Sequence, residues 1–149
     1  MTFSKVIFVY HFLFKITNPH IQKLVQELER IVLAWTGVSS GIHPMGGKAF
    51  TLYGREIGHI HWNGDLDIIF GRQLTAELMR LGLARAHKIV SEVAITFSLQ
   101  NTEHLPIAVS LLRFSYLRIL TRLADTDLEL KTYVERESAT LPTELKQLL

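Results

Sequence analysis

The glycines of this 149-residue chain are confined to its middle. All nine lie between Gly37 and Gly82. Glycine adopts the positive φ angles that turns and bulges need, and it weakens helices. We therefore expect strands and turns in the middle of the chain and helices at both ends. With 48% apolar and 20% charged residues, the chain has the composition of an ordinary globular domain.

Two long helices are predicted beside the glycine-rich middle. Asn18 as N-cap and Pro19 as first residue begin one, its apolar residues advance by threes and fours, and Gly37 ends it. Pro106 begins the other, which runs to Leu123. Its apolar residues cover more than one stripe, so we expect it to be buried on several sides or to meet a partner chain.

The middle of the chain predicts an antiparallel sheet of about four strands. The runs with strand-like composition or alternation are Lys48 to Tyr53, Arg55 to Trp62, Leu66 to Phe70 and Val93 to Leu99. A short helix is expected between Gly71 and Gly82. Residues 39–47 read as a loop. The predicted class is therefore α+β, with a sheet flanked by N-terminal and C-terminal helices.

We expect a single domain over residues 1–149, with a core at about 18–124 and an acidic helical tail at 125–149. A break at Pro142 predicts one or two surface helices in that tail. The apolar run from Val6 to Phe14 has about half of the ~20 residues that a membrane span needs, and no cleavage site follows it. It predicts a buried first element, no membrane partner and a cytoplasmic location.

Composition and missing motifs exclude several kinds of chemistry. The chain has no cysteine, so disulfides, thiolate nucleophiles and cysteine-bound metals are ruled out. A formal charge of +2 is far from the strongly basic surface that binds phosphates, and we expect no nucleic-acid partner. Phosphate-binding glycine loops and the nucleophile elbow of serine hydrolases are also missing.

His59 and His61 are the first candidate functional residues. They alternate in a predicted strand, so their imidazoles share one face, roughly 7 Å apart. Glu56 would lie on the opposite face of that strand. A histidine titrates near neutral pH, and a carboxylate partner can fix its tautomer, so acid–base chemistry is open to such a pair.

The turn at Asn63-Gly64 decides what lies opposite these histidines. A two-residue turn, which this dipeptide favours, would place His59 opposite Ile68 and turn the carboxylates to the other face. A loop one residue longer would place His61 opposite Asp67 and create a His-His-Asp set. The first alternative lacks a third ligand, so we expect no stoichiometric metal.

One segment of the sequence resembles the luciferase-like domain family, a group of short bacterial proteins to which the fungal luciferase looks related. The resemblance runs from about His43 to Tyr116. Its sharpest parts are Arg55-Glu56-Ile57-Gly58-His59-Ile60-His61, Asp67, His87 and Leu111-Leu112-Arg113-Phe114-Ser115-Tyr116.

The resemblance implies an α+β fold with histidines near a shared site. Oxygenation of an aromatic luciferin is known only for distant members of the family. Residues that match its pattern are Glu56, His59, His61 and His87. With the neighbouring Trp62 and Asp67, the candidate ligand-binding residues are Glu56, His59, His61, Trp62, Asp67 and His87.

These observations support three hypotheses about function. The leading one is a histidine-lined pocket for a flat apolar or aromatic small molecule, with haem as a candidate cofactor. The second is a cofactor-independent oxygenase or another acid–base enzyme, in which Glu56 or Asp67 orients a catalytic histidine. The third is a homodimeric interaction module that pairs through the helix ending at Leu123.

Overall fold

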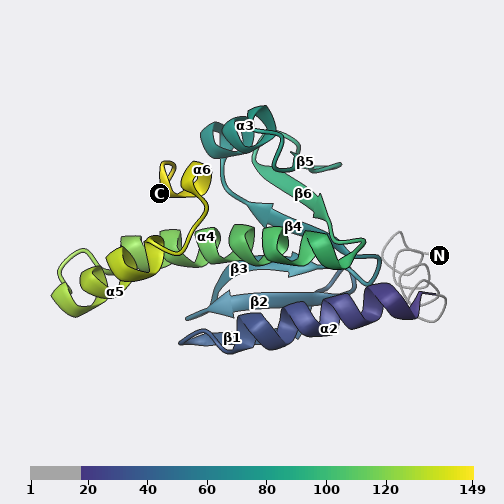
Figure 1. The fold of residues 1–149 in the computed structure, drawn as a ribbon, viewed down its shortest axis with the longest axis horizontal. Coiled ribbons are helices and arrows are strands. Elements are labelled where there is room, and N and C mark those ends of the chain that lie inside the picture. Colours follow the sequence, from purple (N-terminus) through teal and green to yellow (C-terminus); the bar gives the residue numbers. More distant parts are fainter. Residues whose placement is uncertain (1–17) are drawn as a thin grey trace.

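The computed structural model describes residues 18–149 and shows an α+β fold (Figure 1). The helices are α2 (Pro19–Leu33), α3 (Arg72–Arg80), the short 3-10 helix η1 (Thr102–His104), α4 (Leu105–Leu123), α5 (Leu128–Ser138) and α6 (Thr143–Lys146). The strands are β1 (Val38–Ile42), β2 (Lys48–Leu52), β3 (Arg55–Ile60), β4 (Asp65–Ile69), β5 (Arg85–Ala86) and β6 (Ala94–Ser98). The first element expected at Val6 to Phe14 lies outside the described residues.

The sheet has six strands in the order β1-β2-β3-β4-β6-β5, and all neighbouring pairs are antiparallel. The predicted class is confirmed, although about four strands were expected. The strand β1 lies where a loop was predicted, since Val38-Ser39-Ser40-Gly41-Ile42 has no strand-like composition. Pairing with β2, including a hydrogen bond between the Ser39 and Thr51 hydroxyls, holds it in the sheet. The strand β5 is two residues long and too short to show a period.

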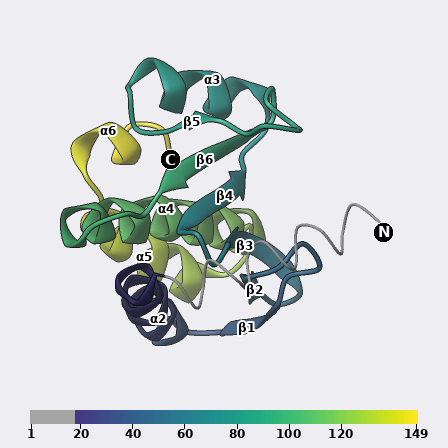
Figure 2. The ribbon, with the colours of Figure 1, turned by 90° about the vertical axis from the view of Figure 1, so that its right-hand side faces the viewer.

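The helices α2 and α4 cover the same face of the sheet (Figures 1 and 2). As predicted, α2 begins at Pro19, and the Asn18 side chain accepts a hydrogen bond from the backbone N–H of Ile21. The stripe that α2 buries consists of Ile21, Leu24, Val25, Leu28 and Val32. Its apolar spacing therefore sets the face that it turns to the sheet, whereas the helix ends at Leu33, before the Gly37 at which its end was predicted.

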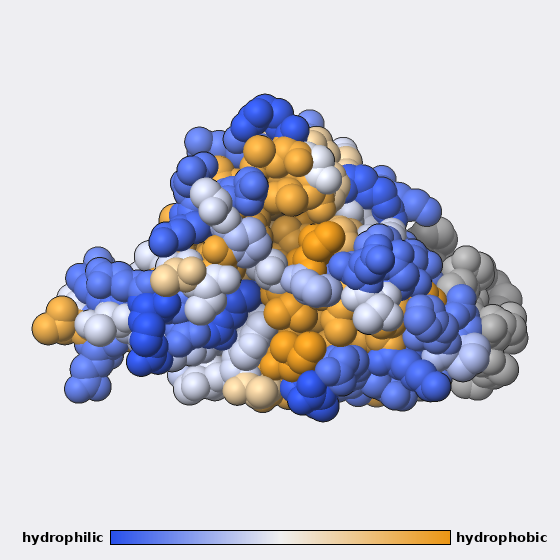
Figure 3. All heavy atoms as spheres, in the orientation of Figure 1, coloured by the Kyte–Doolittle hydropathy of each residue, from blue (hydrophilic) through white to orange (hydrophobic). Residues whose placement is uncertain are grey.

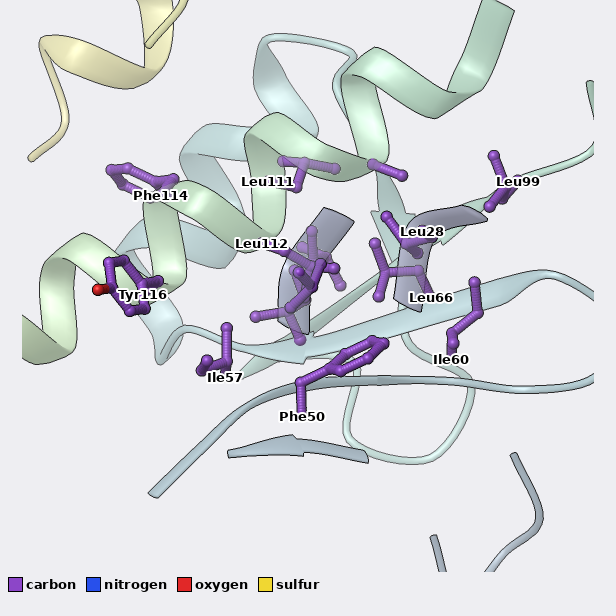
Figure 4. Close-up of a cluster of buried hydrophobic side chains, with 14 of the residues drawn as sticks. Leu28, Phe50, Ile57, Ile60, Leu66, Leu99, Leu111, Leu112, Phe114 and Tyr116 are labelled. Atoms are coloured by element: carbon purple, nitrogen blue, oxygen red, sulfur yellow. The ribbon is translucent and has the colours of Figure 1, made fainter. Parts of the chain in front are cut away.

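The hydrophobic core lies between this sheet face and the two helices. Figure 4 shows Phe50, Ile57 and Ile60 of the strands below Leu112 of α4 and Leu28 of α2. All five side chains are at most 1% exposed. This packing uses one face of the sheet and leaves the polar side chains of β3, β4 and β6 on the other face.

Helix α4 is buried on several sides by its own chain. This is the first of the two alternatives that its broad apolar surface predicted. It packs against α2, β3, α5 and α6. The Arg113 side chain, 12% exposed, forms an ion pair with Glu137 of α5 at 2.5 Å. The tail also adds Val134, Leu141 and Leu145 to the core. Within residues 18–149, no helix is long and apolar enough to cross a membrane.

We expect Gly47→Ala to destabilise the fold by more than about 1 kcal/mol. Gly47 has a φ of +102°, and a Cβ there would lie 2.1 Å from the backbone oxygen of Ile60. Gly41→Ala is the matched control, because a Cβ at Gly41 meets no atom within 4 Å. Urea unfolding of both variants measures the difference. Equal stability of the two variants would contradict the close approach of the two chain segments at Gly47.

Candidate functional site

A pocket of about 560 Å³ lies on the sheet face opposite the core. Strands β3, β4 and β6 form its floor, and the segments after β1 and β5 form its sides. The residues that line it are His43, Met45, His59, His61, Asn63, Asp65, Asp67, Ile69, Arg85, His87, Lys88, Ile89, Val90, Ala94 and Thr96. Four of the seven histidines therefore meet at one place.

The turn between β3 and β4 has a three-residue loop, and the favoured prediction of a two-residue turn was wrong. The His61 N–H donates to the Asp65 carbonyl, and the Gly64 N–H donates to the His61 carbonyl. Gly64 has a positive φ of 87°, whereas Asn63 does not have a positive φ. A type I′ turn needs positive φ at both central residues, and a three-residue loop needs it only at the last. Gly64 of the Asn63-Gly64 dipeptide is therefore the last residue of a three-residue loop.

This register brings the carboxylates to the side of the histidines. His59 pairs with Asp67 and not with Ile68, and Asp65 also lines the pocket. The longer-loop alternative had placed His61 opposite Asp67. Its imidazole instead reaches Asp67 diagonally, with 2.9 Å between His61 Nε2 and Asp67 Oδ2. The His-His-Asp set of that alternative is therefore present.

A β-bulge corrects the prediction that Glu56 lies on the face opposite His59. The pairing of β2 with β3 shifts between Phe50 and Thr51, which leaves Ile57 as an extra residue in β3. A bulge changes the side on which the following residues lie. Ile57 is consequently buried in the core, and Glu56 Oε1 lies 2.6 Å from His59 Nδ1.

Asp67 lies at the centre of the site, and only 5% of the residue is exposed. Its Oδ1 accepts a hydrogen bond of 2.5 Å from the Thr96 hydroxyl. Its Oδ2 is approached by three imidazole Nε2 atoms, those of His61 at 2.9 Å, His87 at 3.3 Å and His59 at 3.5 Å. A buried carboxylate requires such partners, because burial without them disfavours its charge strongly.

These contacts shift the pKa values of the central groups in opposite directions. Burial alone would raise the pKa of Asp67, but hydrogen bonds from His59, His61 and Thr96 hold it below its usual range. Burial alone would lower the pKa of His59, but hydrogen bonds to Asp67 and Glu56 raise it to about 9. His43 stacks on His59 with 3.7 Å between ring centroids. Burial and the neighbouring His59 charge lower the pKa of His43.

The hydrogen bonds at Nδ1 divide the four histidines into two kinds. The Nδ1 atom of His59 lies 2.6 Å from the Glu56 carboxylate, and the Nδ1 atom of His61 lies 3.0 Å from the Gly46 carbonyl oxygen. Both partners are hydrogen-bond acceptors. Those two Nδ1 atoms therefore carry hydrogen. His87 Nδ1 instead accepts from two backbone N–H groups, and His43 Nδ1 accepts from one. In their neutral forms, His87 and His43 carry hydrogen on Nε2.

The structure brings together five of the six residues predicted for the site. His59, His61, Asp67 and His87 line the pocket, and Glu56 supports His59 from beside it. Trp62 lies in the hairpin loop, packs against the core and does not line the pocket. Two further residues that line the pocket, His43 and Thr96, were not predicted from the sequence. The alternation of Thr96 with Ile95 and Phe97 was the available signal that its side chain faces away from the core.

One family model matches a segment of the chain that contains most of the site. Residues 54–115 match the luciferase domain. This confirms the predicted resemblance to the luciferase-like family over a segment that runs from just before β3 into α4. The luciferase-domain segment contains Glu56, His59, His61, Asp67, His87 and Thr96. His43 lies before residue 54 and therefore outside the matched segment. A search of curated proteins and a search of solved structures each found no match.

We expect neutral His87 to occupy the Nε2–H tautomer. The N–H groups of Ile89 and Val90 point at its Nδ1 from 3.1 and 3.2 Å, so that atom has to keep its lone pair. Long-range ¹H–¹⁵N NMR spectra report the tautomer directly, and the exposed His20 provides an internal reference. A hydrogen on Nδ1 of neutral His87 would contradict this arrangement of the segment after β5.

Proposed function

We propose that the protein binds a flat apolar or aromatic small molecule in the pocket above Asp67. The observation that carries this proposal is the combination of a polar floor with an exposed apolar rim. Ile69, Ile89 and Val90 line the pocket and are 67%, 69% and 42% exposed. Large apolar side chains gathered around a cavity favour a ligand that covers them.

The size and chemistry of the pocket fit such a ligand. A volume of about 560 Å³ lies within the usual range for sites that bind small molecules. The Nε2–H group of His43 can donate a hydrogen bond to a hydroxyl or carbonyl oxygen. Lys88 also lines the pocket and favours a ligand with an acidic group, whereas Arg85 is paired with Asp65. Haem remains a candidate, since it is planar and carries propionates and since imidazoles ligate its iron.

A second candidate function is acid–base catalysis in the same pocket, as a cofactor-independent oxygenase or another histidine-based enzyme. The specific observation is the contact of 2.9 Å between His61 Nε2 and Asp67 Oδ2. Thr96 fixes Asp67 from its other oxygen, and the proton between His61 Nε2 and Asp67 is the one that such an enzyme would transfer. The luciferase-domain match supports an enzyme of this kind, because the distant fungal member oxygenates an aromatic compound.

A homodimer is a further proposal that follows from the sequence. Apolar side chains gather between α3 and α4 on the face shown in Figure 3. A groove of about 260 Å³ lies there, with Leu83, Ile107 and Leu145 among its lining residues. Light scattering at micromolar concentration tests the dimer: twice the chain mass supports it, and the mass of one chain rejects it.

The cytoplasmic location also stays a prediction.

The ligand proposal predicts that haemin or a planar hydroxylated aromatic compound raises the unfolding temperature and changes its own absorbance when titrated into the protein. Ile89→Asp should weaken that binding at least tenfold, because it places a charge on the apolar rim of the pocket. Leu128→Asp is the matched control, since Leu128 is 77% exposed on α5 and outside the pocket. Neither residue is packed in the core, so both variants should fold.

Two results would reject the ligand proposal. One is the absence of any thermal or spectral change with every compound in the series. The other is equal weakening of binding by Ile89→Asp and Leu128→Asp, which would place the binding surface elsewhere.

A further inference from the structure

We propose that His59, His61 and Asp67 form a binding site for one divalent first-row transition metal ion at the floor of the pocket. The ligand atoms would be the two imidazole Nε2 atoms and Asp67 Oδ2. The metal site can exist without an organic ligand. Only the further idea that the ion also binds the small molecule in the pocket rests on the proposed function.

Two of the three distances between the ligand atoms are close to those that one ion imposes. Asp67 Oδ2 lies 2.9 Å from His61 Nε2 and 3.5 Å from His59 Nε2. The ligand atoms of the three residues all lie within 4.8 Å of one another. Nitrogen and oxygen ligands at about 2.1 Å from an ion, with angles between 90° and tetrahedral, are about 3.0 to 3.4 Å apart. Small rotations of the side chains would therefore complete the geometry.

The Nδ1 partners orient both imidazoles for metal binding. His59 donates from Nδ1 to Glu56, and His61 donates from Nδ1 to the Gly46 carbonyl. In the metal-free site each ring also donates from Nε2 to Asp67, and an ion bound at Nε2 would take the place of that hydrogen while Nδ1 keeps its own. Histidines that bind metals nearly always donate their other nitrogen to a carboxylate or a carbonyl in this way. Both kinds of partner occur here.

The same criterion separates these ligands from the other two histidines. His87 Nε2 also lies 3.3 Å from Asp67 Oδ2, but its Nδ1 accepts two backbone hydrogen bonds, so its Nε2 carries the hydrogen. His87 is therefore a hydrogen-bond donor to the carboxylate. A second cluster of His43, Glu56 and His59 is less suited to an ion, because His43 Nδ1 accepts from the Met45 N–H.

The donor set indicates which ions would bind. Two imidazoles and one carboxylate, without a thiolate, suit Mn²⁺, Fe²⁺, Co²⁺, Ni²⁺ and Zn²⁺. Two histidines and one carboxylate are the protein ligands of many non-haem iron(II) sites. Three protein ligands leave positions for water or for oxygen atoms of a molecule in the pocket. The prediction of no metal assumed that Asp67 faced away from the histidines, and the observed register removes that assumption.

Calorimetry with Co²⁺, and with Fe²⁺ under anaerobic conditions, tests the site on chelator-treated full-length protein. We expect one ion per chain. Asp67→Asn and His61→Gln should each weaken binding about 100-fold or more. His87→Gln should retain one ion per chain, and His20→Ala, at an exposed histidine outside the pocket, should bind as the unaltered protein does. Circular dichroism checks that each variant is folded.

A measurement on the unaltered protein avoids any dependence on folding of the variants. Co²⁺ shifts the NMR signals of its histidine ligands, and both Nδ1–H groups are retained in this arrangement. We expect two strongly shifted exchangeable signals, one from each of His59 and His61. No Co²⁺ binding, or a bound ion with a different number of such signals, would overturn the proposal. So would Asp67→Asn that folds and binds with undiminished affinity.

The outcome also separates this inference from the proposed function. Binding of an aromatic compound by the metal-free protein, with no binding of Co²⁺ or Fe²⁺, would reject the metal site and keep the small-molecule pocket. One bound ion, with no response to any compound in the series, would keep the metal site and reject the pocket ligand.

Discussion

The carboxylate of Asp67 is the group on which the arrangement of the site depends. It is buried in the middle of the sheet, where an uncompensated charge would be costly. The Thr96 hydroxyl meets one oxygen, and imidazoles that come from β3 and from the segments after β3 and β5 meet the other. Thr96 and His87 are far from β3 in the sequence. Because all these groups meet one carboxylate, its hydrogen bonds connect the pairing of β3, β4 and β6 with the position of the segment after β5.

One face of the sheet packs against the core and the other carries the polar site, and a bulge in β3 makes both possible. The extra residue Ile57 allows β3 to bury Ile57 and Ile60 in the core while Glu56 and His59 share the other face. Gly58 lies within the bulged stretch, where a Cβ would come within 2.9 Å of Leu112 on α4. A rigid core on one side of the strands can therefore support a polar site on the other.

Much of this fold could be predicted from the sequence, because its signals are local. Asn18 and Pro19 mark the start of α2, and the glycines mark the strand region. The register at Asn63-Gly64 could not be predicted in this way. The dipeptide fits two loops, and the choice depends on contacts across the sheet, such as the Leu99 N–H that donates to the Gly64 carbonyl. A one-residue difference in register reverses the face of every side chain. The composition of the site was therefore partly predicted, but its geometry was not.

The central claim is that β3 and β4 pair so that Asp67 lies among the histidines. Cross-strand nuclear Overhauser effects measure this pairing directly in solution. The structure predicts backbone contacts between His59 and Asp67 and between Ile60 and Leu66, with His61 N–H bonded to the Asp65 carbonyl. Contacts of His59 with Ile68 in place of Asp67 would show a two-residue turn and carboxylates on the opposite face, and they would contradict the account.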